Sequence, residues 1–345
     1  MARDPGPGGK RPGLSSASRA WGSGLALALA LFAGAAPVFA QALPEFSVPS
    51  WAYPQVQGPP AAPADGVTPI RIPGSTQHYT EAELRDRFLA TDWFPQSHAP
   101  MPGVVAHGEK PDVFACGFCH SPRGQGRPEN AALAGLPTRY ILRQLEDLRS
   151  GARRGAGPAT YRPTANMVRI ATHVRPEDAL AAAEYFSRQR LDHRVNVHEQ
   201  EMVPKVHVAG ILYAFDEGRG EEPLAGRLLE VAPDYERHER HEDGLVYEAF
   251  VPPGSLARGQ ELARKGAAPI PACESCHGAG LRGVGEAPPL AGRFPTYLLR
   301  QLLAFRTGSR RGPASEPMRE VASKLELRDM IAAAAYAASL APESP

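Results

Sequence analysis

A five-residue motif that occurs twice, CGFCH at 116–120 and CESCH at 273–277, constrains this chain more than any other feature. The two copies contain all four cysteines of the sequence. Two thiols at this spacing match the two vinyl groups on one edge of a haem, and the histidine that follows can reach the iron from the same helical turn. The motifs therefore predict two covalently attached haem c groups. The attachment residues are Cys116, Cys119, Cys273 and Cys276, and the proximal iron ligands are His120 and His277.

Other uses of paired cysteines fit the sequence less well. A zinc site would place its two CxxC pairs ~15–20 residues apart, whereas 157 positions separate Cys116 from Cys273. A thioredoxin-like redox pair needs a preceding strand and a following helix, and neither motif has that context. Two disulfides, the default expectation in an exported chain, would leave the histidine after each pair unexplained.

The motifs belong to a longer repeat. LAGLPTRYILRQLEDLRSGARRG at 133–155 matches LAGRFPTYLLRQLLAFRTGSRRG at 290–312 at the same offset of 157 as the cysteines. Apolar residues recur in both at helical spacing, with Gly151 and Gly308 as candidate C-terminal caps. After a loop, residues 166–187 match 317–338 at an offset of 151, and each stretch ends in an alanine-rich helix. The chain therefore contains a duplicated unit, here called the first copy (roughly 101–189) and the second copy (252–340).

The repeat also nominates the second axial ligand of each iron. Met167 and Met318 occupy the same repeat position, and we expect each on a loop before the final helix, where it can cross the distal haem face. The alternative for any methionine is a place in the apolar core. Met330, which lies inside an alanine-rich helix with Ala179 as its repeat partner, illustrates that alternative.

Some rival ligands are less well placed. Met101 and His107 precede the first motif, but their repeat counterparts are a proline and an arginine. His238 and His241 lie in the charged run DYERHERHED, which we interpret as a solvated loop.

The N-terminal 40 residues predict a secretory signal peptide. Four basic residues precede a short apolar run at 25–32, and small residues follow up to Ala40, the expected last residue removed. The run is shorter than the ~20 residues that span a bilayer, although an uncleaved anchor is the alternative. We expect no later span, and peripheral association with a membrane stays open. The formal net charge of +1 moves only to slightly negative on cleavage, which gives no support to nucleic-acid binding.

The motifs, the LAG and Y-x-x-x-Q-L stretches and the late methionines together resemble the two-haem class I c-type cytochromes of the cytochrome c4 family. The resemblance implies small α-helical domains, His/Met ligation, a periplasmic location and electron transfer with redox partners. Such partners are a periplasmic dehydrogenase, a respiratory complex or a terminal oxidase.

The resemblance also implies roles for residues around each haem. Pro289 would supply a backbone carbonyl to the proximal histidine, with Ala132 at that position in the first copy. The first copy also has Ser121 where the second has Gly278. Arg153 and Arg310 are candidates for the haem propionates, with exposed loop arginines as the alternative. The residues expected to line the haem environment are Tyr140, Gln144, Tyr297 and Gln301.

The expected fold is mainly α, with two tandem class I cytochrome c domains joined by a longer linker that contains some β-strand. The expected organisation is a signal peptide at 1–40, a Pro-rich extension at 41–100 with a short helix near 80–90, domain 1 at 101–192, a linker at 193–250 and domain 2 at 251–342. Strand-like runs at 205–215 and 244–252 suggest a small β-element packed between the two domains.

Three functions remain open at this point. The first is an electron carrier rather than a catalyst, because methionine ligands close the distal haem sites. The second is a two-haem redox enzyme, of the cytochrome c peroxidase or thiosulfate-oxidising kind, which would need an acid/base residue beside one haem. The third is the cytochrome subunit of a periplasmic dehydrogenase or oxidase complex.

Overall fold

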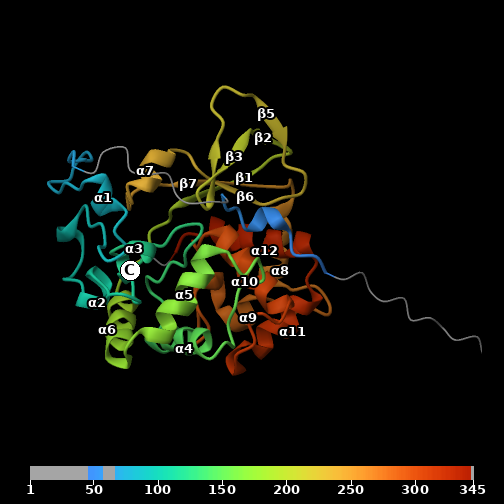
Figure 1. Ribbon diagram of the computed structural model, residues 1–345. Coiled ribbons are helices and arrows are strands. Elements are labelled where there is room, and N and C mark those ends of the chain that lie inside the picture. The colour runs from blue at the N-terminus through green and yellow to red at the C-terminus, as the bar shows by residue number, and fades with distance from the viewer. Residues whose placement is uncertain (1–45, 57–66, 343–345) are drawn as a thin grey trace, which may run out of the picture. The chain divides into compact units, whose positions relative to one another are not determined.

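The computed structural model describes residues 46–56 and 67–342. The predicted signal peptide lies outside the described residues. Residues 46–345 form one compact unit, and the elements named below all belong to it (Figure 1). Among the described residues, no helix is both long and apolar enough to cross a membrane.

The first copy consists of five helices, the second of which contains the first motif. The alanine-rich α6 begins with Pro176 at its first position and has Glu177 and Asp178 in its first turn, which favours a helix start. The helices are α2 (Gly103–Ala106), α3 (Cys116–His120), α4 (Thr138–Arg149), α5 (Arg162–His173) and α6 (Pro176–Ser187). Their apolar faces enclose a core that includes Val105, Ile141 and Phe186.

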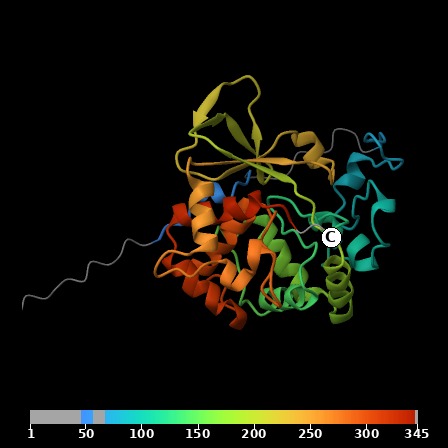
Figure 2. The same cartoon turned by 180° about the vertical axis from the view of Figure 1, so that it is seen from behind.

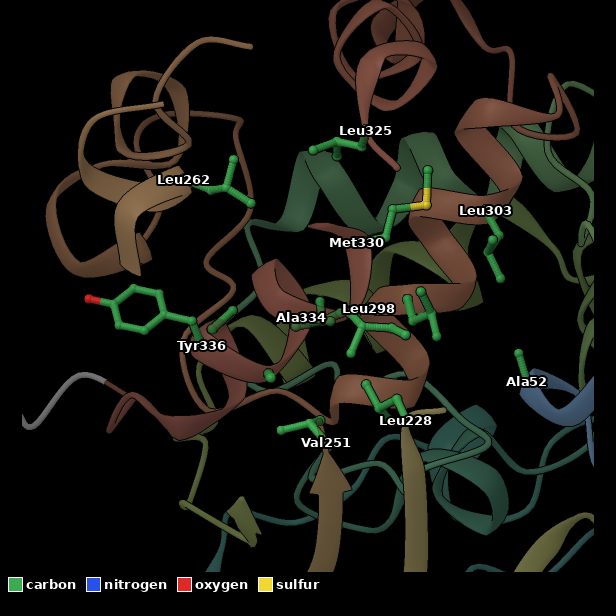
Figure 3. Packing of buried hydrophobic residues seen from close by; sticks show 14 of the residues in the cluster. Ala52, Leu228, Val251, Leu262, Leu298, Leu303, Leu325, Met330, Ala334 and Tyr336 are labelled. Carbon is green, nitrogen blue, oxygen red and sulfur yellow. The ribbon is translucent and has the colours of Figure 1, made fainter. Parts of the chain in front are cut away.

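The second copy repeats this order with a longer first helix. Its helices are α8 (Ser255–Arg264), α9 (Glu274–His277), α10 (Pro295–Arg306), α11 (Glu316–Lys324) and α12 (Leu327–Ser339), with 3-10 turns η3 (Ala279–Leu281) and η4 (Pro313–Ser315). Helices α8 and α12 pack closely because Gly259 has no side chain: a Cβ there would lie 2.1 Å from the carbonyl oxygen of Ala332. Met330 is fully buried in this core (Figure 3), in agreement with its predicted packing role.

Seven strands lie between the two copies in sequence. Five form a sheet of order β1-β7-β6-β4-β3 and two form a separate pair, β2 with β5. The strands are β1 (Val195–Glu199), β2 (Met202–Pro204), β3 (Val206–Ala209), β4 (Leu212–Phe215), β5 (Glu221–Pro223), β6 (Leu229–Ala232) and β7 (Tyr247–Val251), with α7 (Tyr235–Glu239) before β7. The strand-like runs of the sequence correspond to the β3–β4 hairpin and to β7.

The sheet does not separate the two copies, and this part of the prediction was wrong. Its apolar face packs on the second copy, where Phe294 and Ala338 share a cluster with Val195 and Tyr247. Both views show the strands on one side of α10 and α12 (Figures 1 and 2). The two helical copies instead contact each other directly, through paired backbone at Arg153 and Arg310.

The segment before the first copy is also divided between the two copies. The 3-10 turn η1 (Ser50–Ala52) places Ala52 in the core of the second copy. Helix α1 (Glu81–Leu84) begins with a Thr80–Glu83 capping box but ends sooner than the predicted 80–90. The side chain of Asp86 accepts a hydrogen bond from the Phe88 amide at 2.9 Å, which favours a turn over helix continuation. A second 3-10 turn, η2 (Pro95–Ser97), follows.

Candidate haem sites

Both motif histidines are oriented by the same backbone interaction. The His120 Nδ1 lies 2.7 Å from the carbonyl oxygen of Ala131, and the His277 Nδ1 lies 2.9 Å from that of Pro288. A carbonyl only accepts, so Nδ1 must carry the proton and Nε2 is left with its lone pair. Burial lowers the pKa of both imidazoles, so each is held neutral, as an iron ligand must be.

The carbonyl that accepts the histidine's hydrogen bond differs by one residue from the prediction. Pro288 and Ala131 accept from the histidines, whereas the Pro289 oxygen accepts from Arg293 at 2.6 Å and the Ala132 oxygen accepts from Arg293 at 2.5 Å. Sequence alone did not distinguish these neighbours, because successive carbonyls in an irregular loop point in different directions.

The first copy reaches this geometry in spite of Ser121. Ser121 has φ 65° and ψ 154°, close to the φ 74° and ψ 164° of Gly278. This region of backbone space is normally reserved for glycine and costs of order 1–3 kcal/mol for another residue. The serine is therefore strained into the glycine conformation, and the loop after the motif keeps the same path in both copies.

A cavity of about 530 Å³ joins the two motif regions, and most of the predicted site residues line it. Its volume falls in the range of cofactor pockets. The predicted residues among its walls are His120, Met167, His277, Met318, Cys273, Cys276, Tyr140, Gln144, Tyr297, Gln301 and Pro289. Cys116 and Cys119 sit on α3, where both thiols are free and partly buried.

Both methionines come from helices rather than from the loops that we predicted. Met167 lies in α5, and Met318 lies in the first turn of α11. The loops end earlier because Pro163 and Pro317 favour helix starts within the first two positions of their helices. The rival Met101 has its sulfur against the motif backbone, 3.7 Å from the position of a Cβ on Gly117.

Two arginines at one repeat position contribute to the contact between the copies. Residues Arg153 and Arg310 pair with each other in an antiparallel bridge. Arg153 donates to Gln144 at 3.0 Å, to Tyr297 at 3.1 Å and to Gln301 at 3.0 Å. Arg310 donates to Gln301 at 3.2 Å, to Tyr140 at 2.9 Å and to Gln144 at 2.8 Å. Equivalent residues thus contact each other across a local twofold relation.

These arginines are not exposed loop residues, which was the alternative reading of the sequence. Arg310 is 5% exposed and has a buried Nε without a hydrogen-bond partner. Arg293, 4% exposed, donates only to backbone carbonyls, and burial lowers its pKa to about 10. Burial raises the pKa of Tyr140, but the guanidinium groups of Arg310 and Arg153 outweigh it and lower that pKa overall.

The residues present therefore fit haem. Among the described residues, no ion pair includes Arg153, Arg293 or Arg310. Buried guanidinium groups are costly in isolation and call for anions nearby. The Asp147 carboxylate is one such anion, since burial lowers the pKa of Arg153 and the charge of Asp147 is among the effects that raise it. Haem propionates are such anions, and the cavity also offers thiols, neutral imidazoles and thioether sulfurs. Burial raises the pKa of Cys116 to about 12 and that of Cys119 to about 11. Among the described residues, no three His, Cys, Asp or Glu side chains are grouped to hold a metal ion.

Several contacts around the first motif had no clear signal in the sequence. His238 is 4% exposed and lies 2.9 Å from the Tyr247 hydroxyl, so the charged run is not a solvated loop. The His241 ring packs against Phe118 with ring centroids 4.9 Å apart. Glu129 is 5% exposed with one carboxylate oxygen unpaired. The sequence offered one hint of unusual contacts here: the charged residue Arg293 stands where the first copy has the apolar Leu136.

Comparisons with known proteins find similarity to the family that the sequence resembles. Residues 256–341 match the family model of cytochrome c. Cytochrome c4 of Azotobacter vinelandii is 26% identical over 244 residues, which cover 70% of this chain and 90% of that protein. A thiosulfate dehydrogenase electron acceptor of Stutzerimonas stutzeri (strain A1501) is 27% identical over 238 residues, 68% of this chain and 82% of that one.

A solved thiosulfate dehydrogenase of Marichromatium purpuratum shares 27% identity, over 68% of this chain and 38% of that one, with a TM-score of 0.44. The family implies haem c as the cofactor and electron transfer as the activity. The chain is thus similar to the cytochrome c4 proteins over about two thirds of its length, and its residues 256–341 match cytochrome c.

Proposed function

We propose that this protein is a periplasmic two-haem electron carrier in which each iron is bound by a histidine and a methionine. The observation that carries the proposal is the duplicated site: His120 and His277 are held alike, and both line one cavity together with Met167 and Met318. The two tandem cytochrome domains would be residues 101–192 and 251–342. Haem c supplies the one-electron chemistry when bound.

The chain's own residues would position and tune the two groups. The carbonyls of Ala131 and Pro288 orient the imidazoles, and thioether ligands favour the reduced iron. The arginine pair, shared by both copies, would hold propionates of both haems near the contact between the copies. Two groups in one cavity favour passage of an electron from one to the other.

The donor that we propose is a periplasmic dehydrogenase. One similar protein is named a thiosulfate dehydrogenase electron acceptor, and this supports the proposal that the present chain accepts electrons from a dehydrogenase. The acceptor would be a respiratory complex or a terminal oxidase. Permanent attachment to such a dehydrogenase, as a subunit, would appear as co-purification from the native cell.

Haem quantification tests the proposal. We expect two haems per chain in the exported protein, and one haem after replacement of either cysteine pair, C116A/C119A or C273A/C276A. Both ferric haems should be low-spin and show a methionine-to-iron charge-transfer band. One haem per wild-type chain, or a high-spin ferric signal with peroxide turnover, would contradict the carrier and favour a redox enzyme.

A further inference from the structure

The two haem sites differ in how far the surface around each motif is covered. In the first copy, residues 121–129 after the motif are buried or half-buried throughout. In the second copy, the corresponding 278–286 include Val284, which is 62% exposed, and Cys276 itself is exposed whereas Cys119 is not. A thioether at Cys276 would therefore put one edge of its haem at the protein surface.

Segments outside the repeat produce this difference. Phe118, between the cysteines of the first motif, packs against His241 of the segment that joins the copies. Trp93, from the segment before the first copy, donates from Nε1 to the carbonyl of Arg240 at 2.8 Å, which ties the two covering segments together. The residue that corresponds to Phe118 in the second motif is Ser275, which is exposed. The first motif is thus closed by the chain itself.

The open surface around the second motif, here called its rim, comprises Lys265, Cys276, Arg282 and Val284. The rim has an apolar centre. The Val284 side chain lies against the motif, because a Cβ on Gly278 would be 2.7 Å from its Cγ2. The rim also has uncompensated positive charge. Lys265 and Arg282 are exposed, and within the described ranges 46–56 and 67–342 no ion pair includes either of them.

Acidic groups near this rim are already engaged. The Glu274 carboxylate accepts a hydrogen bond from the Gly280 amide at 3.2 Å. Glu286 is paired with Arg139, at 2.8 Å, and with Arg143 of the first copy. Lys265 lies at the end of α8, and the next residue, Gly266, approaches residues 270–272 just before Cys273. The Glu274 carboxylate keeps its charge, but the two free cations Lys265 and Arg282 outnumber it, so the net free charge around the exposed cysteine is positive.

We infer that the rim of the second motif, formed by Lys265, Cys276, Arg282 and Val284, is the docking face for an acidic redox protein, and that the covered first motif does not serve as one. The inference rests on the proposed two-haem carrier function. One electron would leave the ferrous iron of the second haem for the oxidised centre of the docked partner, so that the iron becomes ferric and the partner is reduced by one electron. The first haem would exchange its electron only through the second.

The test uses the full two-haem protein and an acidic blue-copper protein, plastocyanin, as probe. We expect R282E to slow electron transfer to oxidised plastocyanin roughly three- to tenfold at low ionic strength, and K265E/R282E to slow it further. Isothermal titration calorimetry with both proteins reduced, so that no electron moves, should show Kd raised by a similar factor. Added salt should weaken wild-type binding and leave the double variant little changed.

The matched control is R190E. Arg190 is an exposed arginine of the first copy, and its carbonyl accepts a hydrogen bond from Gln125 in the loop after the first motif. We expect wild-type rates and Kd for this variant. An R190E effect as large as that of R282E, or no R282E effect in protein with two intact haems, would overturn the docking face alone. Wild-type protein with fewer than two haems would instead overturn the proposed function.

Discussion

The loops after the two motifs have the same backbone and different surroundings. Each holds its histidine through a carbonyl eleven residues later, and each passes through the same glycine-like conformation, at Ser121 and at Gly278. Yet the first loop is covered by segments from outside the repeat, and the second is open around Val284. The duplication thus preserves the histidine geometry that we propose for cofactor binding, whereas the unrepeated segments cover the first loop and leave the second open.

Removal of the methionines that we propose as axial ligands is expected to have the largest effect. In M167A and in M318A, one haem should lose its methionine-to-iron band, and its reduction potential should fall by on the order of 0.1 V, because the thioether favours ferrous iron. Spectroelectrochemistry of each variant measures both quantities. M101A is the control, since Met101 contacts the first motif at Gly117. A spectrum altered by M101A and not by M167A would mean that Met101 binds the first iron. The two copies would then not use equivalent methionines.

A buried carboxylate from the sheet should make stability depend on pH in the second copy. Glu230 accepts a hydrogen bond from the Thr296 amide at 3.0 Å, at the start of α10, and burial raises its pKa from 4.5 to about 7. The corresponding helix of the first copy, α4, has no side chain that caps its start in this way. The folded state binds this proton more tightly, so the contribution to stability is full below pH 4.5 and is lost as the pH rises through about 7.

Unfolding free energies measured from pH 4.5 to 8 check this sign. The wild type should lose about 3 kcal/mol relative to E230Q over that range, because a pKa unit corresponds to about 1.4 kcal/mol. A wild-type curve parallel to that of E230Q would show that Glu230 keeps its ordinary pKa.

Substitutions at the residue after each motif should change the free energy of unfolding in opposite directions. S121G should raise the free energy of unfolding by about 1 kcal/mol, because it relieves the strained backbone at less than its full cost. G278S should lower it by about 2 kcal/mol, because its Cβ would also lie 2.7 Å from Val284 and 2.9 Å from the Gly283 oxygen. Denaturant unfolding of both variants measures the difference. Equal effects would mean that the two loops do not share one conformation in solution.

The smallest expected effect concerns the cover of the first motif. F118S gives the first motif the residue of the second, and it should cost about 1 kcal/mol through loss of the contact with the His241 ring. It should also speed electron exchange of the first haem with small anionic oxidants. The reciprocal S275F, at an exposed position, should leave stability unchanged. An unchanged rate of electron exchange in F118S would show that Phe118 does not shield the first haem from small oxidants.

The sequence by itself determined the cofactor class, the duplicated helical unit and the proximal histidines that we propose. These features depend on local spacing, because a few residues of sequence suffice to recognise them. The patterns are two thiols and an imidazole on one turn, and apolar residues at the helical period. Offset comparison also nominated Met167 and Met318, the methionines that we propose as ligands, although it misplaced both on loops. Met330 was correctly assigned to the core for the same local reason.

Only the tertiary structure decided the features that join distant segments. The choice of Pro288 over Pro289 depends on where one carbonyl points in a folded loop. The mutual pairing of Arg153 with Arg310 depends on how two copies face each other. The burial of His238 depends on a sheet that packs on the second copy and on a short helix beside the first motif. Such contacts form between residues from about ten to more than a hundred positions apart. Their free energy comes from burial and pairing that no local pattern records.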